Sequence, residues 1–115
     1  MSSARILNIS SRSRDQAIVV DLDGAIDIQN SPGLRTALFE KLSETPRLAV
    51  NMAGIRYIDS SGIATLIEVF KKAHDLKKDF VLFGLGSSVY NVLKLTNLLG
   101  VFRIADTEEA ALKSK

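Results

Sequence analysis

The chain has 115 residues and a formal net charge of +2, which suits one domain with one hydrophobic core. Hydrophobic residues make up 46% and charged residues 24%, a balance that predicts a globular fold rather than disorder. There is no cysteine, which excludes disulfides, thiolate metal sites and a cysteine nucleophile. No basic stripe with interleaved aromatic residues is present, and no apolar run approaches the roughly 20 residues that span a bilayer. We therefore expect neither nucleic-acid binding nor membrane insertion.

The chain shows no internal repeat, low-complexity tract or linker, so we expect a single domain over residues 1–115 with its core at about 6–112. The first residues lack the apolar stretch of a secretory signal. A cytoplasmic protein is the resulting expectation.

The first two strands are expected close together in the sequence. Arg5–Ser10 alternates apolar and polar residues, the polar segment Ser11–Asp15 predicts a turn, and Ala17–Leu22 is rich in β-branched residues. The short gap between the two strands favours an antiparallel hairpin. Asp23-Gly24 is expected to end the second strand.

Three further strands are expected, at Arg47–Met52, Asp79–Phe83 and Phe102–Ala105. The first of these is a nearly continuous apolar run, which is typical of a central strand covered on both faces. Ala53–Ile58 is expected to link it to the next helix.

Four segments are predicted to form helices. The first begins at Ser31-Pro32, with Ser31 as its cap, and stops before Pro46. The second is Ile63–Leu76, in which apolar residues recur at helical spacing. The remaining two follow later in the chain: one is capped by Ser87 or Ser88, with Thr96 on its inner side and Gly100 as its C′ residue, and the last is Thr107–Lys113, capped by Thr107.

This order alternates strands and helices after the hairpin. It predicts an α/β fold with a mostly parallel sheet of four to five strands, one antiparallel N-terminal strand and about four helices.

Catalytic constellations are poorly supported. His74 is the only histidine, and it lies roughly 14 residues, or about 20 Å at 1.5 Å per residue, along a helix from Ser60. A metal site or a Ser-His-Asp triad is therefore not expected. Gly84-Leu85-Gly86 lacks the pattern of a phosphate-binding loop, and Asp21 and Asp23 are expected to stay solvated at a strand end. Asp27 and Asp59 are a second acidic pair that could in principle do acid–base work.

The tetrapeptide Asp59-Ser60-Ser61-Gly62 stands between the third strand and the second helix. A helix N-terminus presents unpaired backbone N–H groups and stabilises negative charge, including a phosphate. Asp and Ser are preferred N-cap residues, so capping alone explains the motif. Two serines exceed what a cap requires, and Gly62 predicts room for a close-approaching partner. Capping and a phosphorylation switch both remain open on these grounds.

Four segments of this chain, taken together at their spacing in the sequence, resemble the STAS domain family, and more narrowly its bacterial anti-sigma factor antagonists. The segments are Leu48–Met52, Ile58–Ile63, Asp23–Asp27 and Val89–Ile104. Asp23–Asp27 is similar to the family's Gly-Glu-Leu-Asp segment, with Ala25 where the family usually has Glu. The resemblance implies a STAS-like single domain.

The resemblance also implies a phosphorylation-gated binding module rather than an enzyme. In that family a kinase-type anti-sigma factor phosphorylates the first serine of the motif, here Ser60, with Ser61 as the second candidate. The unphosphorylated antagonist binds the anti-sigma factor and releases a sigma factor, and a PP2C-type phosphatase removes the phosphate. ATP and magnesium belong to the kinase, so no cofactor is implied for this chain.

The implied partner-binding residues are Asp27, Asp59, Ser60, Ser61, Gly62 and Ile63. Ala25 removes one carboxylate from this face. One alternative is a non-catalytic STAS subunit of an ABC-type lipid transport complex, in which Ser60 is only a cap. Another is a module that binds a nucleotide or lipid at the same helix end. We expect a monomer, because no surplus apolar stripe remains once the helices cover the sheet.

Overall fold

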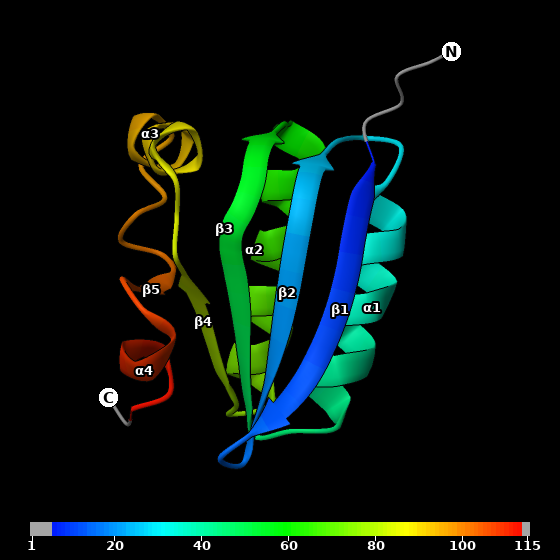
Figure 1. The fold of residues 1–115 in the computed structure, drawn as a ribbon, viewed down its shortest axis with the longest axis vertical. Helices are drawn as coiled ribbons and strands as arrows, with labels where there is room; N and C mark the ends of the chain where they lie inside the picture. The colour runs from blue at the N-terminus through cyan, green and yellow to red at the C-terminus, as the bar shows by residue number, and fades with distance from the viewer. Residues whose placement is uncertain (1–5, 114–115) are drawn as a thin grey trace.

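The computed structural model describes residues 6–113. The elements in that range are β1 (Leu7–Arg14), β2 (Ala17–Ile26), α1 (Ser31–Ser43), β3 (Arg47–Ile58), α2 (Ser60–Asp75), β4 (Asp79–Phe83), α3 (Ser87–Leu95), β5 (Arg103–Ala105) and α4 (Glu108–Ala111). The strands form one sheet in the order β1-β2-β3-β4-β5 (Figure 1). β1 is antiparallel to β2, and the other neighbours pair in parallel. The predicted fold class is confirmed.

β1 is longer than predicted, and the turn after it is shorter. The chain turns at Asp15 and Gln16, which have positive φ angles of 49° and 65°. A two-residue turn of this kind matches the twist of a hairpin. The predicted turn at Ser11–Asp15 was wrong because most side chains of this edge strand are exposed, so no apolar alternation marks its second half. Arg5, the predicted first residue of the strand, lies outside the described residues.

β2 and β3 both run beyond their predicted ends. β2 crosses Asp23-Gly24 and ends at Ile26, and β3 includes the predicted link and ends at Ile58. Gly24 has a φ of 127° next to shifts in register, and a Cβ there would lie 1.9 Å from the carbonyl oxygen of Ile6. The glycine therefore accommodates a bulge and does not end the strand.

Alternate residues of the central strands face two separate apolar clusters. Val20 and Val50 face the cluster beneath α1 and α2, which lie behind the sheet in Figure 1. Val19 and Ala49 face the opposite side, where they pack with Ala111 of α4. Cover on both faces explains why β3 begins as a continuous apolar run.

The predicted cap of α4 is confirmed and that of α3 was wrong. The hydroxyl of Thr107 accepts a hydrogen bond from the backbone N–H three residues on, at 3.1 Å. The N-cap residue of α3 is Gly86, rather than Ser87 or Ser88. Ser88 instead donates its hydroxyl to the carbonyl oxygen of Arg56 in β3, at 3.0 Å. The Ser88 hydroxyl therefore binds an acceptor on another element, although the local sequence predicts that it caps α3.

α3 also ends earlier than predicted. Its C-cap residue is Thr96, which is exposed rather than inward, and Asn97 follows with a φ of 62°. The N–H of Leu98 donates to the carbonyl oxygen of Leu93 at 2.7 Å, which completes a Schellman motif. Asn97 therefore takes the role predicted for Gly100, since asparagine also tolerates the left-handed conformation.

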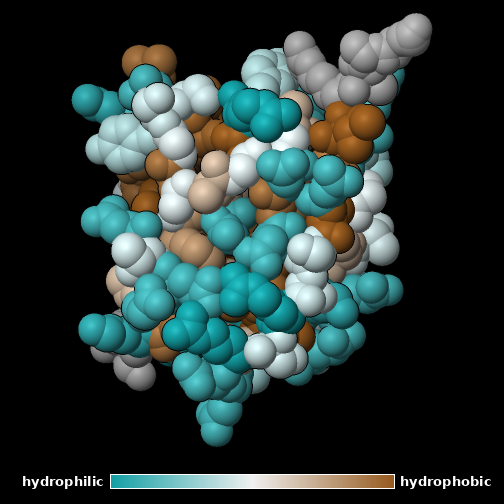
Figure 2. Space-filling view, in the orientation of Figure 1, coloured by the Kyte–Doolittle hydropathy of each residue, from teal (hydrophilic) through white to brown (hydrophobic). Residues whose placement is uncertain are grey.

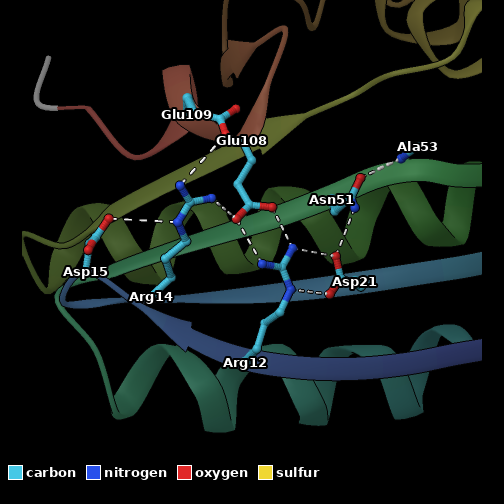
Figure 3. A network of polar contacts seen from close by, with 8 residues as sticks. All are labelled: Arg12, Arg14, Asp15, Asp21, Asn51, Ala53, Glu108 and Glu109. Atoms are coloured by element: carbon cyan, nitrogen blue, oxygen red, sulfur yellow. Dashed lines mark hydrogen bonds and ion pairs between the residues drawn. The ribbon is translucent and has the colours of Figure 1, made fainter.

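Charged side chains fasten α4 to the sheet (Figure 3). Glu108 binds the guanidinium groups of Arg12 and Arg14 of β1, and Arg12 also pairs with Asp21 of β2 at 2.8 Å. Hydrogen bonds from Arg12 hold the pKa of Glu108 down to about 2 and lower the pKa of Asp21. Asn51 of β3 donates to Asp21 as well, at 2.9 Å. The prediction that Asp21 is solvated at a strand end was wrong, because it belongs to this network.

Candidate functional site

The motif lies where two parallel strands end side by side. Ile26, the last residue of β2, pairs with Ile58, the last residue of β3. The N–H of Asp59 donates to the carbonyl oxygen of Ile26 at 3.1 Å. Because the carboxyl ends of parallel strands meet at one edge of a sheet, the turn from β2 to α1 and the start of α2 are neighbours (Figure 1).

Asp59 is the N-cap residue of α2, and its carboxylate accepts three hydrogen bonds. Oδ1 accepts from the N–H groups of Ser61 at 2.9 Å and Gly62 at 3.2 Å. Oδ2 accepts from the N–H of Ile28 at 3.1 Å. Two of these bonds satisfy orphan donors of the helix, and the third ties the helix to the β2–α1 turn. A carboxylate, rather than a serine hydroxyl, therefore caps α2.

Ser60 and Ser61 are left free by this arrangement. Ser60, the first residue of α2, is exposed, and Ser61 is half-buried. Within residues 6–113 neither hydroxyl hydrogen-bonds to another protein group. Ser60 is thus the more accessible of the two candidate phosphoacceptors.

Gly62 and Ile63 lie inside the fold. A Cβ on Gly62 would lie 2.6 Å from side-chain carbons of both Ile26 and Ile58. Ile63 is only 8% exposed and belongs to the cluster beneath α2. The reason predicted for Gly62, room for a partner, was wrong, since the missing side chain lets the helix start approach the sheet. Gly62 and Ile63 therefore pack beneath the exposed start of α2 that carries Ser60.

Asp27 and Asn30 close the turn between β2 and α1. Asp27 Oδ1 accepts from the N–H groups of Gln29 and Asn30, at 2.9 and 3.1 Å. Asn30 accepts from the N–H of Asp27 and donates to the carbonyl oxygen of Ala25, both at 2.9 Å. Asn30 is also the N-cap residue of α1, so the predicted cap Ser31 was wrong. The Asp27…Asn30 spacing is the local signal that predicts such a turn.

We did not predict Ile28 as a residue of the site from the sequence. Its N–H binds the Asp59 carboxylate, while its side chain is 71% exposed. No local pattern indicates this contact, because its partners lie 31 residues apart in the chain.

The residues weighed for catalysis lie apart from the motif. His74 is exposed near the other end of α2, where its ring stacks on Phe70 with centroids 6.4 Å apart. Gly84–Gly86 connects β4 to α3. In the described part of the chain, no group of three or more His, Cys, Asp and Glu residues is placed to hold a metal ion. Nor does any helix there combine the length and apolarity needed to cross a membrane.

Comparisons with known proteins agree with this architecture. Residues 8–111 match the STAS domain. An anti-sigma-B factor antagonist of Listeria monocytogenes is 26% identical over 103 residues, which are 89% of this chain and 90% of that protein. The crystal structure of an anti-sigma factor antagonist from Mycobacterium paratuberculosis superposes with a TM-score of 0.87 at 22% identity, covering 97% of this chain and 96% of that one. The Bacillus cell fate determinant SpoIIAA in its phosphorylated form gives 0.69 at 16% identity, covering 90% and 96%.

The fold and the helix start together define an α/β domain that presents two free serine hydroxyls at the carboxyl edge of its sheet. The match over residues 8–111 shows that the chain belongs to the STAS domain family, as the resemblance predicted.

Proposed function

We propose that this protein is an anti-sigma factor antagonist gated by phosphorylation of Ser60. The unphosphorylated form binds a kinase-type anti-sigma factor in the cytoplasm and thereby releases a sigma factor. The name of the Listeria relative, an anti-sigma-B factor antagonist, supports the pathway. The phosphorylated form of SpoIIAA, which shares this fold, supports the modification.

One observation carries the proposal: Asp59 caps α2 and leaves the Ser60 hydroxyl exposed and free. A phosphate on Ser60 therefore breaks no hydrogen bond within the domain. It would also stand at a helix N-terminus, where negative charge is favoured. The domain should keep its fold when Ser60 is modified.

Phosphorylation would act on binding through charge. It adds about 1.5 to 2 negative charges at neutral pH. Asp59 and Asp27 lie on the segments next to Ser60, so the added charge meets like charges on this surface. A partner surface matched to a neutral hydroxyl would have to bury a dianion. A loss of about 2.7 kcal/mol in binding is about a hundredfold in affinity.

The remaining residues have distinct roles in the proposal. Asp27 uses Oδ1 within the turn, so Oδ2 is available to a basic side chain of the partner. Ser61 contributes a second hydroxyl, and Gly62 and Ile63 hold the helix start against the sheet. The kinase binds ATP and magnesium, and a PP2C-type phosphatase restores the unphosphorylated form.

The test is phosphorylation by the cognate kinase-type anti-sigma factor with ATP and magnesium, with the product mapped by mass spectrometry. We expect phosphate on wild-type protein and on Ser61→Ala, and none on Ser60→Ala. Ser60→Asp should stay folded and bind the anti-sigma factor about a hundredfold more weakly. Phosphate on Ser61 alone, or on neither serine, would refute the proposal. Co-purification with a transporter ATPase instead of a kinase would favour the transport-subunit alternative.

A further inference from the structure

We propose that Ile28 is an apolar contact for the partner that acts on Ser60, and that Asp59 is the residue that positions it. This inference rests on the proposed function and adds a specificity-determining residue to it. It concerns a side chain of the β2–α1 turn, which the phosphorylation motif does not include.

The turn that carries Ile28 is held rigidly. Side chains of Asp27 and Asn30 bind its backbone at distances of 2.9 to 3.1 Å. The N–H of Ile28 itself binds Asp59 Oδ2 at 3.1 Å. The same carboxylate caps the helix that begins with Ser60. Asp59 thus fixes the Ile28 backbone and the Ser60 backbone relative to one another, and a preorganised surface loses less entropy when a partner binds.

The Ile28 side chain has no role in the core. It is 71% exposed and is absent from the described apolar clusters. Small and polar residues are the usual choice in a turn, and a β-branched apolar side chain adds nothing to turn formation. Tyr57 of β3, which is 41% exposed, pairs in register with Ala25 just before the turn. Exposed apolar side chains therefore lie both in the β2–α1 turn and near the end of β3, the strand that leads to Ser60.

Single exposed apolar residues are common, so exposure alone would say little. The position of Ile28 adds one fact, because its backbone binds the residue next to Ser60. Figure 2 draws the face of the sheet opposite α1 and α2, where hydrophobic residues are more frequent in the upper part, the end at which β2 and β3 stop in Figure 1. The lower part of that face is mostly hydrophilic. The end that carries Ser60 is the one suited to a protein contact.

The chemistry of the surface defines the kind of partner. The kinase-type anti-sigma factor should offer an apolar recess for Ile28 beside the groups that receive the Ser60 hydroxyl. A basic side chain near that recess would face the free Oδ2 of Asp27. Burial of one isoleucine side chain corresponds to about tenfold to a hundredfold in affinity.

The first experiment compares Ile28→Ala with Leu76→Ala in the full chain. Leu76, the C-cap residue of α2, is 45% exposed and lies at the far end of the same helix, so it is a matched control. Ile28→Ala should raise the Kd for the kinase-type anti-sigma factor at least tenfold. It should also raise the KM for phosphorylation of Ser60 and leave kcat unchanged. Leu76→Ala should bind like the wild type, and Ile28→Leu should retain most of the affinity.

The second experiment tests positioning with Asp59→Asn. The amide oxygen can still cap α2, but the amide nitrogen cannot accept from the N–H of Ile28. Hydrogen exchange at the Ile28 amide should become at least tenfold faster. In a double-mutant cycle, Ile28→Ala should cost less affinity in the Asp59→Asn protein than in the wild type. Full additivity, with unchanged exchange at Ile28, would overturn the positioning role.

Ser60→Asp serves as the reference that separates the two proposals. If Ser60→Asp weakens binding and Ile28→Ala binds like Leu76→Ala, the inference fails while the proposed function stands. If the wild type neither binds the anti-sigma factor nor accepts phosphate on Ser60, the proposed function fails and the inference fails with it. Urea unfolding of each variant confirms the fold, and Ile28→Thr, which keeps the β-branched shape, replaces Ile28→Ala if the alanine variant is unstable.

Discussion

The sequence does not decide which of three residues caps α2, and the structure assigns the cap to Asp59. Asp59, Ser60 and Ser61 are all acceptable N-cap residues, so local preference does not rank them. The N–H of Ile28 holds the Asp59 carboxylate at the helix start, and this contact comes from a residue 31 positions earlier. The serine hydroxyls are free as a result, and capping coexists with modification at neighbouring residues.

Gly62→Ala should lower the free energy of unfolding by about 1 to 3 kcal/mol, because the new Cβ would lie 2.6 Å from carbons of Ile26 and Ile58. Gly33→Ala in α1 is the matched control. An added Cβ there meets nothing within 4 Å, so this change should raise stability by about 0.5 to 1 kcal/mol. Urea unfolding followed by circular dichroism measures both. Equal effects would show that the sheet does not fill the space at Gly62.

At the scale of elements, periodicity predicted the bodies of the helices and strands better than their ends. The apolar stripe of α2 depends only on spacing within the helix. The end of α3 depends on which residue adopts the left-handed conformation, and both Asn97 and Gly100 are suited to it. Strand ends depend on the partner strand: β2 continues past Gly24 because β3 continues beside it.

Asn97→Ala should destabilise the protein by about 0.5 to 1 kcal/mol, because alanine tolerates the φ of 62° less well than asparagine. Gly100→Ala should change stability by less than about 0.5 kcal/mol, since an added Cβ meets nothing within 4 Å and no positive φ is required there. Thermal unfolding of the two variants compares them. A larger loss of stability from Gly100→Ala than from Asn97→Ala would show that Gly100 is the C′ residue of α3, as the sequence predicted.

At the scale of the whole molecule, α4 closes the face of the sheet opposite α1 and α2. Glu108 joins it to Arg12, a residue 96 positions away, and Ala111 covers the apolar cluster beneath. Arg47 and Arg103 also bind carbonyl oxygens at the end of α4. Strand β1 and helix α4 are thus tied together on the face of the sheet opposite α1 and α2.

Stability should fall in acid because of Glu108. Its folded pKa of about 2 lies below the ordinary value of 4.5, so the unfolded chain binds a proton first. The stabilisation is fully present above about pH 4.5 and is lost as the pH falls toward 2. Glu108→Gln should lower the free energy of unfolding near pH 7 by about 1 to 2 kcal/mol and reduce its pH dependence between pH 5 and 2.

The matched control for this prediction is Glu109→Gln. The Glu109 side chain is 71% exposed and lies 3.8 Å from Arg14, so its loss should have little effect at any pH. Urea unfolding at a series of pH values distinguishes the two. If the free energies of unfolding of Glu108→Gln and the wild type depend on pH in the same way, Glu108 is not the source of the loss of stability in acid.

The sequence by itself determined the order of the elements, the antiparallel first strand and the place of the serine motif at a helix start. These follow from signals within a few residues: hydrophobic periodicity, turn residues and capping residues. The family resemblance rested on the same local segments and their spacing.

Only the tertiary structure decided that Asp59 caps α2, that Gly62 is needed inside the fold and that Ile28 stands fixed beside Ser60. Each depends on residues brought together by the pairing of β2 with β3, such as Ile26 with Ile58. The competing local choices differ little in energy, so contacts between segments distant in the chain select among them.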